Sequence, residues 1–201
     1  MDRIAIWLEA NAPDVLCMQE TKVKDEKFPV TQFEELGYQV TIHGQSGYNG
    51  VAIASKTPIS DVQIGLPISS DPEARGISAT VNGFQIINVY VPNGQSVESE
   101  KYAYKLNWLD ALVHWVEGTY DPGVPLVLTG DFNIAPEDRD VYDPVLLEGE
   151  ILCTTKERSR FQRLLDIGLS DALRLTTESG GIYTFWDYRG GAFRLNHGFR
   201  I

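Results

Sequence analysis

Short apolar runs alternate along this chain with longer amphipathic segments, and this alternation constrains the fold more than any other feature. The runs at 14–18 and 124–129 are apolar without alternation, which is typical of strands buried on both faces. Asn82-Gly83 separates two further runs and predicts a tight hairpin. The predicted elements are helices over 2–11, 30–36, 98–117 and 158–167, and strands over 14–18, 38–43, 50–55, 61–66, 76–81, 84–91 and 124–129. No linker divides them, so we expect a single domain over residues 1–201.

Charge and cysteine content narrow the class of protein. The 201 residues include 17 Lys and Arg against 28 Asp and Glu, so the formal net charge is −11. This excludes a broadly basic nucleic-acid-binding surface, but it allows a local basic groove or a metal site built from carboxylates. The two cysteines, Cys17 and Cys153, predict free thiols and a cytoplasmic location. No apolar run approaches the ~20 residues of a membrane-spanning helix, so no membrane partner is expected.

Polar side chains follow three of the predicted strands at the point where each strand ends. Glu20 comes after the first run, where a carboxylate is of no use to strand packing and could bind a hard cation. Tyr90 and Asn93 follow the second and carry neutral donors that suit phosphate oxygens. Asp131 and Asn133 follow the third, and a spacing of two puts both side chains on one side of an extended strand.

Each of these segments also has a simpler interpretation, which the residues alone leave open. Glu20 could begin a solvated loop, and Tyr90 could pack at a sheet edge beside a turn formed by Asn93. Asp131 and Asn133 could close an Asx turn. The combination favours a site, because parallel neighbouring strands would bring these ends to one edge. No basic phosphate cage accompanies them, so a divalent cation should supply the positive charge.

Six ordered motifs resemble the exonuclease III family, the abasic-site endonucleases of the endonuclease/exonuclease/phosphatase superfamily. The motifs are Pro-Asp-Val-Leu-Cys-Met-Gln-Glu-Thr-Lys (13–22), Gly-Tyr-Asn-Gly-Val-Ala (47–52), Asn-Val-Tyr-Val-Pro-Asn-Gly (88–94), Gly-Asp-Phe-Asn-Ile-Ala-Pro (130–136), Gly-Leu-Ser-Asp-Ala-Leu-Arg (168–174) and Tyr-Thr-Phe-Trp-Asp-Tyr-Arg (183–189). The resemblance implies a four-layer α/β/β/α sandwich of two mixed sheets. It also implies a DNA repair nuclease that cuts abasic sites and removes nucleotides from 3′ ends.

The resemblance assigns expected roles residue by residue. Glu20 is similar to the metal-binding Glu of the family, Lys22 to the Lys that orders the carboxylates, and Asp131 to the Asp that orients the attacking water. Tyr90, Asn93 and Asn133 are expected to contact the phosphate. Tyr48 and Arg75 are expected to contact the DNA backbone or groove, and Phe185, Trp186, Phe199 and Ile201 to receive the flipped abasic sugar. Phe185 and Trp186 could equally be ordinary core aromatics.

The resemblance further implies Mg2+ or Mn2+ as cofactor and double-stranded DNA with abasic sites or 3′ ends as partner, bound by a monomer. The family's first strand and its C-terminal Ser-Asp-His motif have no counterpart here, so we expect a fold incomplete at both ends and weak or no activity of this chain. Two other interpretations stay open: a phosphatase or phosphodiesterase from another branch of the superfamily, and a catalytically dead DNA-binding remnant.

Overall fold

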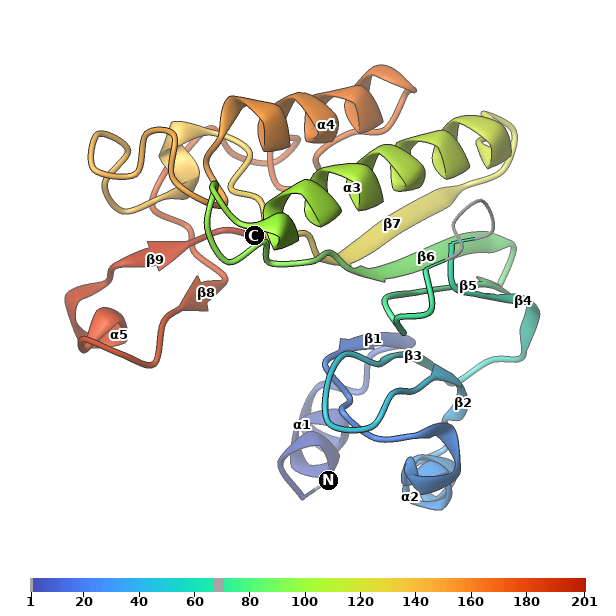
Figure 1. The fold of residues 1–201 in the computed structure, drawn as a ribbon. Helices are drawn as coiled ribbons and strands as arrows, with labels where there is room; N and C mark the ends of the chain where they lie inside the picture. The colour runs from blue at the N-terminus through green and yellow to red at the C-terminus, as the bar shows by residue number, and fades with distance from the viewer. Residues whose placement is uncertain (1, 67–70) are drawn as a thin grey trace. The chain divides into compact units, whose positions relative to one another are not determined.

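The computed structural model describes residues 2–66 and 71–201, whose residues group into two compact units (Figure 1). Unit 1 holds the chain up to Tyr90 together with Tyr120–Asp131, and unit 2 holds Val91–Thr119 and Phe132–Ile201. The chain therefore passes from unit 1 to unit 2 directly after Tyr90 and again directly after Asp131. Both residues are among those that the sequence predicts for the active site.

Unit 1 contains two β-sheets. In the first, β1 (Val15–Gln19) and β2 (Gln39–His43) flank β3 (Val51–Ser55), and both pairs are antiparallel. In the second, the order is β4 (Ile59–Ile64), β5 (Gly76–Val81), β6 (Phe84–Tyr90) and β7 (Leu126–Asp131). The β5–β6 hairpin turns at Asn82-Gly83 as predicted, and β6 and β7 are parallel, so the second sheet is mixed.

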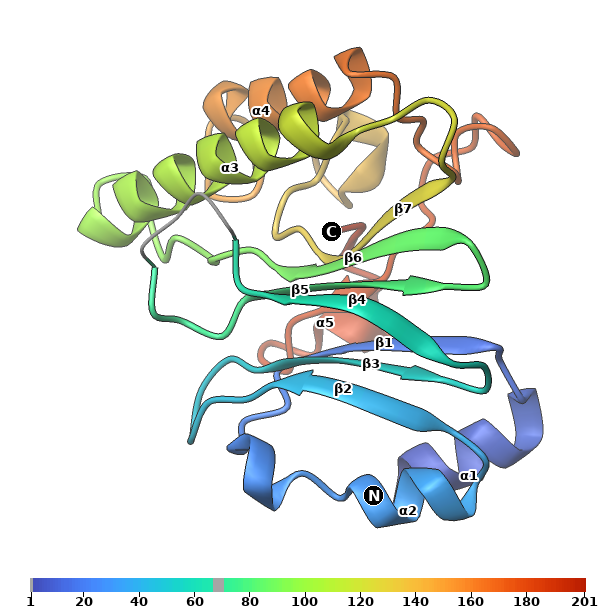
Figure 2. The ribbon, with the colours of Figure 1, turned by 90° about the vertical axis from the view of Figure 1, so that its right-hand side faces the viewer.

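Apolar side chains from both sheets form the core of unit 1. Val51 and Ile53 of the first sheet pack with Ile77 and Ala79 of the second. The outer face of the first sheet is covered by α1 (Asp2–Asn11) and α2 (Val30–Glu35), through a cluster that includes Leu8 and Phe33 (Figure 2). Unit 1 thus stacks a helical layer on two sheets, because each sheet buries one apolar face against the other.

The expectation that 14–18 and 124–129 are strands buried on both faces is wrong. Every residue of β1 is only partly buried, and β7 contains an exposed position, Val127. The reason is topological, since each strand lies at the end of its sheet in the described chain and has one neighbouring strand. The strand that is buried along its whole length is β3, which has a neighbour on each side.

The longest elements of unit 2 are two helices. The long helix α3 (Glu100–Thr119) lies beside α4 (Thr155–Asp166), and Asp110 of α3 forms ion pairs with Arg160 and Arg163 of α4 (Figures 1 and 2). The predicted start of α4 at 158 is wrong because Thr154 caps the helix, accepting a hydrogen bond from the Glu157 backbone N–H at 3.1 Å. The helix therefore begins three residues earlier.

The rest of unit 2 contains short elements. Three of them were not predicted from the sequence: a 3-10 turn at Asp138–Asp140, the strand β8 (Phe185–Trp186) and the helix α5 (Ala192–Leu195). The fourth, β9 (Gly198–Phe199), lies at the end of the chain, where the run 199–201 predicts the beginning of a strand. Unit 1 has one unpredicted 3-10 turn, at Asp25–Lys27. The fully buried carboxylate of Asp140 holds this region of unit 2 together, because it pairs with Arg174 and with Arg200. Arg200 also pairs with Asp171, so one ionic network joins three segments.

The structure also bears on the predictions for the two cysteines and for membrane-spanning helices. Cys17 and Cys153 are both free thiols, as predicted, and burial raises the pKa of each to about 11. Among the residues that the structure describes, no helix has the length and apolar character needed to cross a membrane.

Candidate active site

Glu20 follows β1 directly and forms the centre of a polar cluster in unit 1. Its carboxylate accepts a hydrogen bond from the Tyr90 hydroxyl and pairs with Lys22 Nζ at 2.7 Å. Glu20 and Lys22 both adopt left-handed backbone conformations, with φ of +52° and +56°. Such values are uncommon outside glycine and tend to occur at functional sites. The chain therefore leaves the extended conformation directly after β1, in the segment where Glu20 and Lys22 form their ion pair.

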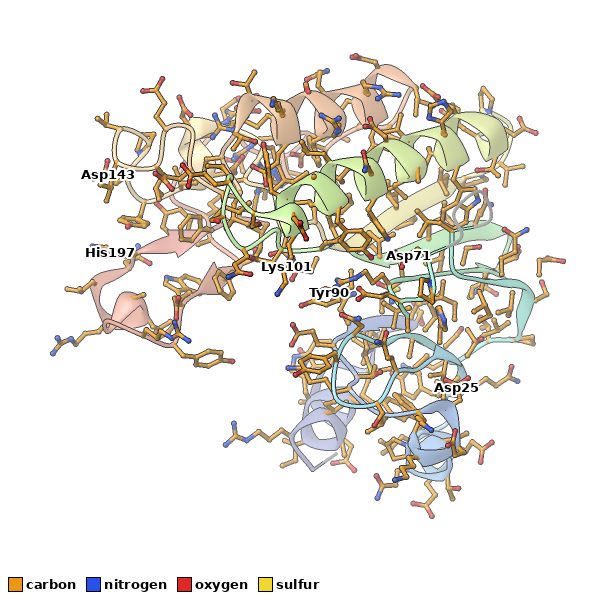
Figure 3. The ribbon with its side chains drawn as sticks, viewed as in Figure 1. Asp25, Asp71, Tyr90, Lys101, Asp143 and His197 are labelled. Atoms are coloured by element: carbon orange, nitrogen blue, oxygen red, sulfur yellow. The ribbon has the colours of Figure 1, made fainter. Side chains whose placement is uncertain are left out.

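Tyr90 ends β6 and joins this cluster from the other sheet of unit 1 (Figure 3). The guanidinium of Arg75 lies 4.9 Å from the centre of the Tyr90 ring, and its Nη1 donates to the Tyr90 carbonyl at 3.2 Å. Arg75 also pairs with Glu73 at 2.5 Å. Arg75, predicted as a DNA contact, therefore contacts both the ring and the backbone carbonyl of Tyr90.

The ionisation of this cluster follows from its contacts. Partial burial acts to raise the pKa of Glu20, but the hydrogen bonds from Lys22 and Tyr90 and the positive charges of Lys22 and Arg75 outweigh it and hold the pKa below its usual value. Burial, then the bond to Glu20, raises the pKa of Tyr90 above the usual phenol value. At neutral pH the cluster thus presents an ionised carboxylate and a protonated phenol.

Asp131 ends β7 and is the register partner of Tyr90 in the parallel β6–β7 pair. The preceding Gly130 makes this pairing feasible. Its φ is +136°, and a Cβ at this position would lie 1.9 Å from the Val89 carbonyl oxygen. Parallel strands therefore do bring Tyr90 and Asp131 to one edge, as expected. Glu20 reaches the cluster differently, from the antiparallel sheet.

Asn93 and Asn133 form a second cluster, in unit 2. Asn93 Nδ2 donates to Asn133 Oδ1 at 3.0 Å, and Asn133 Nδ2 donates to the Val91 carbonyl at 2.9 Å. Asn93 Oδ1 also accepts from the Gln95 backbone N–H at 3.1 Å, so the predicted turn and the predicted site residue coincide. Asn133 has φ of +48° and is 4% exposed, whereas Asn93 is exposed. The argument that an extended strand places Asp131 and Asn133 on one side is therefore wrong.

A buried ion pair underlies the two asparagines, and sequence reasoning missed it. Lys105 Nζ donates to the Asn93 carbonyl at 3.1 Å, to the Asn133 carbonyl at 2.6 Å and to the Glu157 carboxylate. Both Lys105 and Glu157 have fully buried side chains. The signal was present, because Lys105 falls on the apolar face of α3 between Tyr102 and Leu109.

A second missed residue joins the two sheets of unit 1 behind Glu20 and Tyr90. Asn88 is fully buried on β6, and its Nδ2 donates to the carbonyls of Met18 at 2.9 Å and Ala52 at 3.0 Å. Its Oδ1 accepts from Gln19 Nε2 at 2.6 Å. These bonds fix Gln19 next to Asn88, and so fix Glu20 near Tyr90 two residues further along β6.

The four predicted sugar-pocket residues divide into two groups within unit 2. Phe185 pairs with Phe199 in the β8–β9 ladder, with ring centroids 6.4 Å apart, while Phe199 and Ile201 pack on the cluster around Val141 and Leu152. Trp186 points the other way, as neighbours in a strand must. Its ring packs edge-on to Phe193 at 5.3 Å, and its Nε1 donates to Asn196 Oδ1 at 3.3 Å.

Two further aromatic side chains lie on loops. Tyr48, predicted as a DNA contact, is 75% exposed on the loop between β2 and β3. His197, labelled in Figure 3, stacks on Tyr142 with ring centroids 4.3 Å apart.

The donor set fits a Mg2+-like ion held in part by substrate and water. Across residues 2–66 and 71–201, no three His, Cys, Asp or Glu side chains come together as a metal-binding group. Mg2+ is usually bound through one or two carboxylates plus substrate phosphates, and it keeps several waters. Glu20, ionised and exposed, suits that mode of binding.

The class of protein follows from this fold and site together with the sequence match. The sequence matches the Endonuclease/Exonuclease/phosphatase family over residues 1–201, so this chain belongs to that family. Within it, the chain is 35% identical over 207 residues to the exodeoxyribonuclease III of Haemophilus influenzae, covering 96% of this chain and 78% of that protein.

Two solved structures extend the likeness to three dimensions. A 3′–5′ exonuclease from Neisseria meningitidis matches with 44% identity and a TM-score of 0.96, over 100% of this chain and 78% of its own. An AP endonuclease from Archaeoglobus fulgidus matches with 43% identity and a TM-score of 0.93, over 98% of this chain and 77% of its own. These matches confirm the predicted fold class. They also confirm the prediction that the chain is related to hydrolases of the exonuclease III type. The nucleases of the family depend on a divalent metal ion.

Proposed function

We propose that this chain hydrolyses phosphodiester bonds in double-stranded DNA at abasic sites and at 3′ ends, with Mg2+ or Mn2+ as cofactor. The observation that carries the proposal is the contact of an ionised Glu20 with a protonated Tyr90 whose register partner is Asp131. This combines one anionic ligand, one neutral phosphate donor and one base at the ends of three strands, β1, β6 and β7. The names of the similar proteins from Haemophilus, Neisseria and Archaeoglobus support DNA as the substrate.

The two asparagines come shortly after the Tyr90–Asp131 pair in the sequence. Asn133 follows Asp131 by two residues, and Asn93 follows Tyr90 by three. Their proposed role at the phosphate rests on their resemblance to the phosphate-contacting residues of the family.

The residues divide the chemistry between them. Asp131 accepts a hydrogen bond from water, orients it for in-line attack and takes up its proton. Tyr90 and Asn93 donate hydrogen bonds to the phosphate oxygens as negative charge develops on them, with Asn133 holding the Asn93 amide. The Tyr90 hydroxyl has one proton and donates it in a hydrogen bond to Glu20. Tyr90 can therefore donate to a phosphate oxygen only when this hydrogen bond to Glu20 breaks.

The cation would be held by Glu20, and Lys22 would keep the carboxylate ionised and oriented. When bound, a divalent ion supplies Lewis-acid stabilisation of charge on the phosphate and on the leaving oxygen. Phe185, Phe199 and Ile201 offer an apolar surface suited to a sugar that has lost its base, while Tyr48 is exposed enough to contact the DNA backbone. Trp186 contacts Phe193 and Asn196, and its part in binding the sugar stays a prediction.

The test is single-turnover nicking of a duplex with one abasic site, with enzyme in excess and with or without Mg2+. Asp131→Asn should lower the rate by about 10²–10⁴-fold, the range that general acid–base catalysis supplies. Asp14→Asn makes the same chemical change at an exposed carboxylate beside the other end of β1 and should have no effect.

Two results would refute the proposal for this chain. One is metal-independent nicking, or nicking that survives Asp131→Asn. The other is binding of the abasic duplex without turnover and without response to Mg2+, which would identify a DNA-binding remnant. Faster cleavage of a phospholipid head group than of DNA would favour another branch of the superfamily. The cytoplasmic location and monomeric state stay predictions, testable by fractionation and by light scattering.

A further inference from the structure

We infer that Lys105 is a positioning residue for phosphodiester hydrolysis: its buried ammonium group fixes the backbone of Asn93 and Asn133 and thereby the orientation of their amides. The inference rests on the function proposed above and extends it to a residue that touches neither phosphate nor metal. It also makes Glu157 the ion-pair partner of this buried lysine.

Lys105 contacts the backbone of both asparagines. Its Nζ donates hydrogen bonds to the carbonyl oxygens of Asn93 and Asn133 and to the Glu157 carboxylate. These three acceptors suit the N–H donors of an ammonium group. The residues lie 12 and 28 positions away along the chain, which means that one side chain joins two separate loops.

One of the two residues whose backbone Lys105 contacts, Asn133, has an uncommon backbone conformation. Asn133 has φ of +48°, and this left-handed turn points its carbonyl oxygen to within 2.6 Å of Lys105 Nζ. With the backbone fixed on one side, the Asn133 amide is placed to accept from Asn93 Nδ2 and to donate to Val91. Lys105 also passes 3.1 Å from the position that a Cβ on Gly94 would occupy, so a glycine next to Asn93 leaves room for it.

Stability alone does not explain why a lysine is buried at this position. Burying an ion is unfavourable unless partners compensate for lost water, and an apolar pair of similar volume often stabilises as well or better. The Glu157 carboxylate also accepts hydrogen bonds from the Leu152 N–H and from the backbone N–H and hydroxyl of Thr154, the residue that caps α4. What the lysine adds over an apolar residue is therefore the pair of bonds to the asparagine carbonyls.

The experiment separates position from stability with the double variant Lys105→Met/Glu157→Gln. It removes both charges, and Gln at the third helical position keeps the cap on α4. The matched control is Leu112→Ala, a fully buried residue two turns further along α3. Steady-state nicking of the abasic duplex and urea unfolding are measured on the wild type and both variants.

The double variant should cut with kcat about 10–100-fold below the wild type and an unchanged KM, because misplaced groups act mainly on the transition state. Leu112→Ala should lower stability while keeping kcat. The inference is wrong if the double variant retains wild-type kcat, or if kcat in both variants simply follows stability.

A second readout does not depend on activity. Side-chain amide NMR signals, assigned through Asn93→Asp and Asn133→Asp, report hydrogen exchange at the two amides. The double variant should speed exchange of the Asn133 amide at least tenfold, and Leu112→Ala should not. Should the wild type fail to nick DNA, the proposed function fails, yet this exchange experiment still decides the inference: equal exchange in all three proteins overturns it.

Discussion

Gly130→Ala tests whether the approach of β6 to β7 positions the catalytic groups. A Cβ on residue 130 would lie 1.9 Å from the Val89 carbonyl oxygen and 2.8 Å from the Val89 carbonyl carbon and nitrogen. Contacts this short cannot be absorbed by a side-chain rotation, since the three nearest atoms all belong to the Val89 backbone. The strands must therefore separate at Val89↔Gly130, one position before Tyr90↔Asp131.

The expected loss of stability can be worked from the geometry. Placing an alanine at φ of +136° costs about 1–3 kcal/mol of backbone strain. Separating the strands at this point breaks about two ladder hydrogen bonds, at about 1 kcal/mol each. The sum, about 3–5 kcal/mol, is a large part of the 5–15 kcal/mol that typically stabilises a domain.

Gly37→Ala is the matched control, because Gly37 has φ of +82° and nothing within 4 Å of an added Cβ. It carries the strain without the clash and should cost about 1–2 kcal/mol. Urea unfolding followed by tryptophan fluorescence measures both values. Nicking of abasic DNA, at a temperature where both variants are folded, should fall sharply for Gly130→Ala and stay near wild type for Gly37→Ala. Equal losses of stability, or full activity of Gly130→Ala, would refute the reasoning.

Three further outcomes follow from other contacts. Tyr90→Phe removes a donor to the ionised Glu20, so the pKa of Glu20 rises and the acidic limb of the pH–rate profile for nicking moves to higher pH; an unmoved limb would exclude Glu20 as its source. Asp140→Asn leaves Arg174 and Arg200 without their buried carboxylate and should cost about 3–5 kcal/mol in urea unfolding, whereas Asp138→Asn, at an exposed carboxylate, should cost at most about 1 kcal/mol. Phe185→Ala should raise KM several-fold for an abasic duplex and leave removal of nucleotides from an ordinary 3′ end unchanged, and equal effects on both substrates would argue against a sugar pocket.

Local patterns predicted the elements that carry their own signals. The helical spacing in 98–117 gave α3 within two residues at each end, and Asn82-Gly83 gave the β5–β6 hairpin. The edge positions of β1 and β7 were beyond such patterns, because burial of a strand depends on how many neighbours the whole sheet provides. The four residues of β8 and β9 form strands only because the chain between them returns through α5.

The site shows a similar division. Glu20, Tyr90 and Asp131 were predictable because each stands at the end of an apolar run, where packing alone gives no reason for it. The backbone turn at Asn133 was not, since a left-handed φ at a non-glycine residue is maintained by contacts from elsewhere in the chain. The role of Arg75 as a DNA contact stays a prediction. Its position against the Tyr90 ring, directly before β5, is a contact that the motif spacing does not reveal.

Buried polar side chains hold the candidate site residues in position. Asn88, Lys105 and Glu157 are fully buried, and their polar contacts run to backbone and side chains next to Glu20, Tyr90, Asn93 and Asn133. Because an unpaired buried donor or acceptor costs about 1–3 kcal/mol, any fold that misplaces these neighbours also loses stability. The same free energy that selects the native fold therefore selects the geometry of the site. This also explains why a net charge of −11 is compatible with a DNA substrate: the groups that would face the phosphate are positioned locally by neutral or paired contacts, and do not require a basic surface.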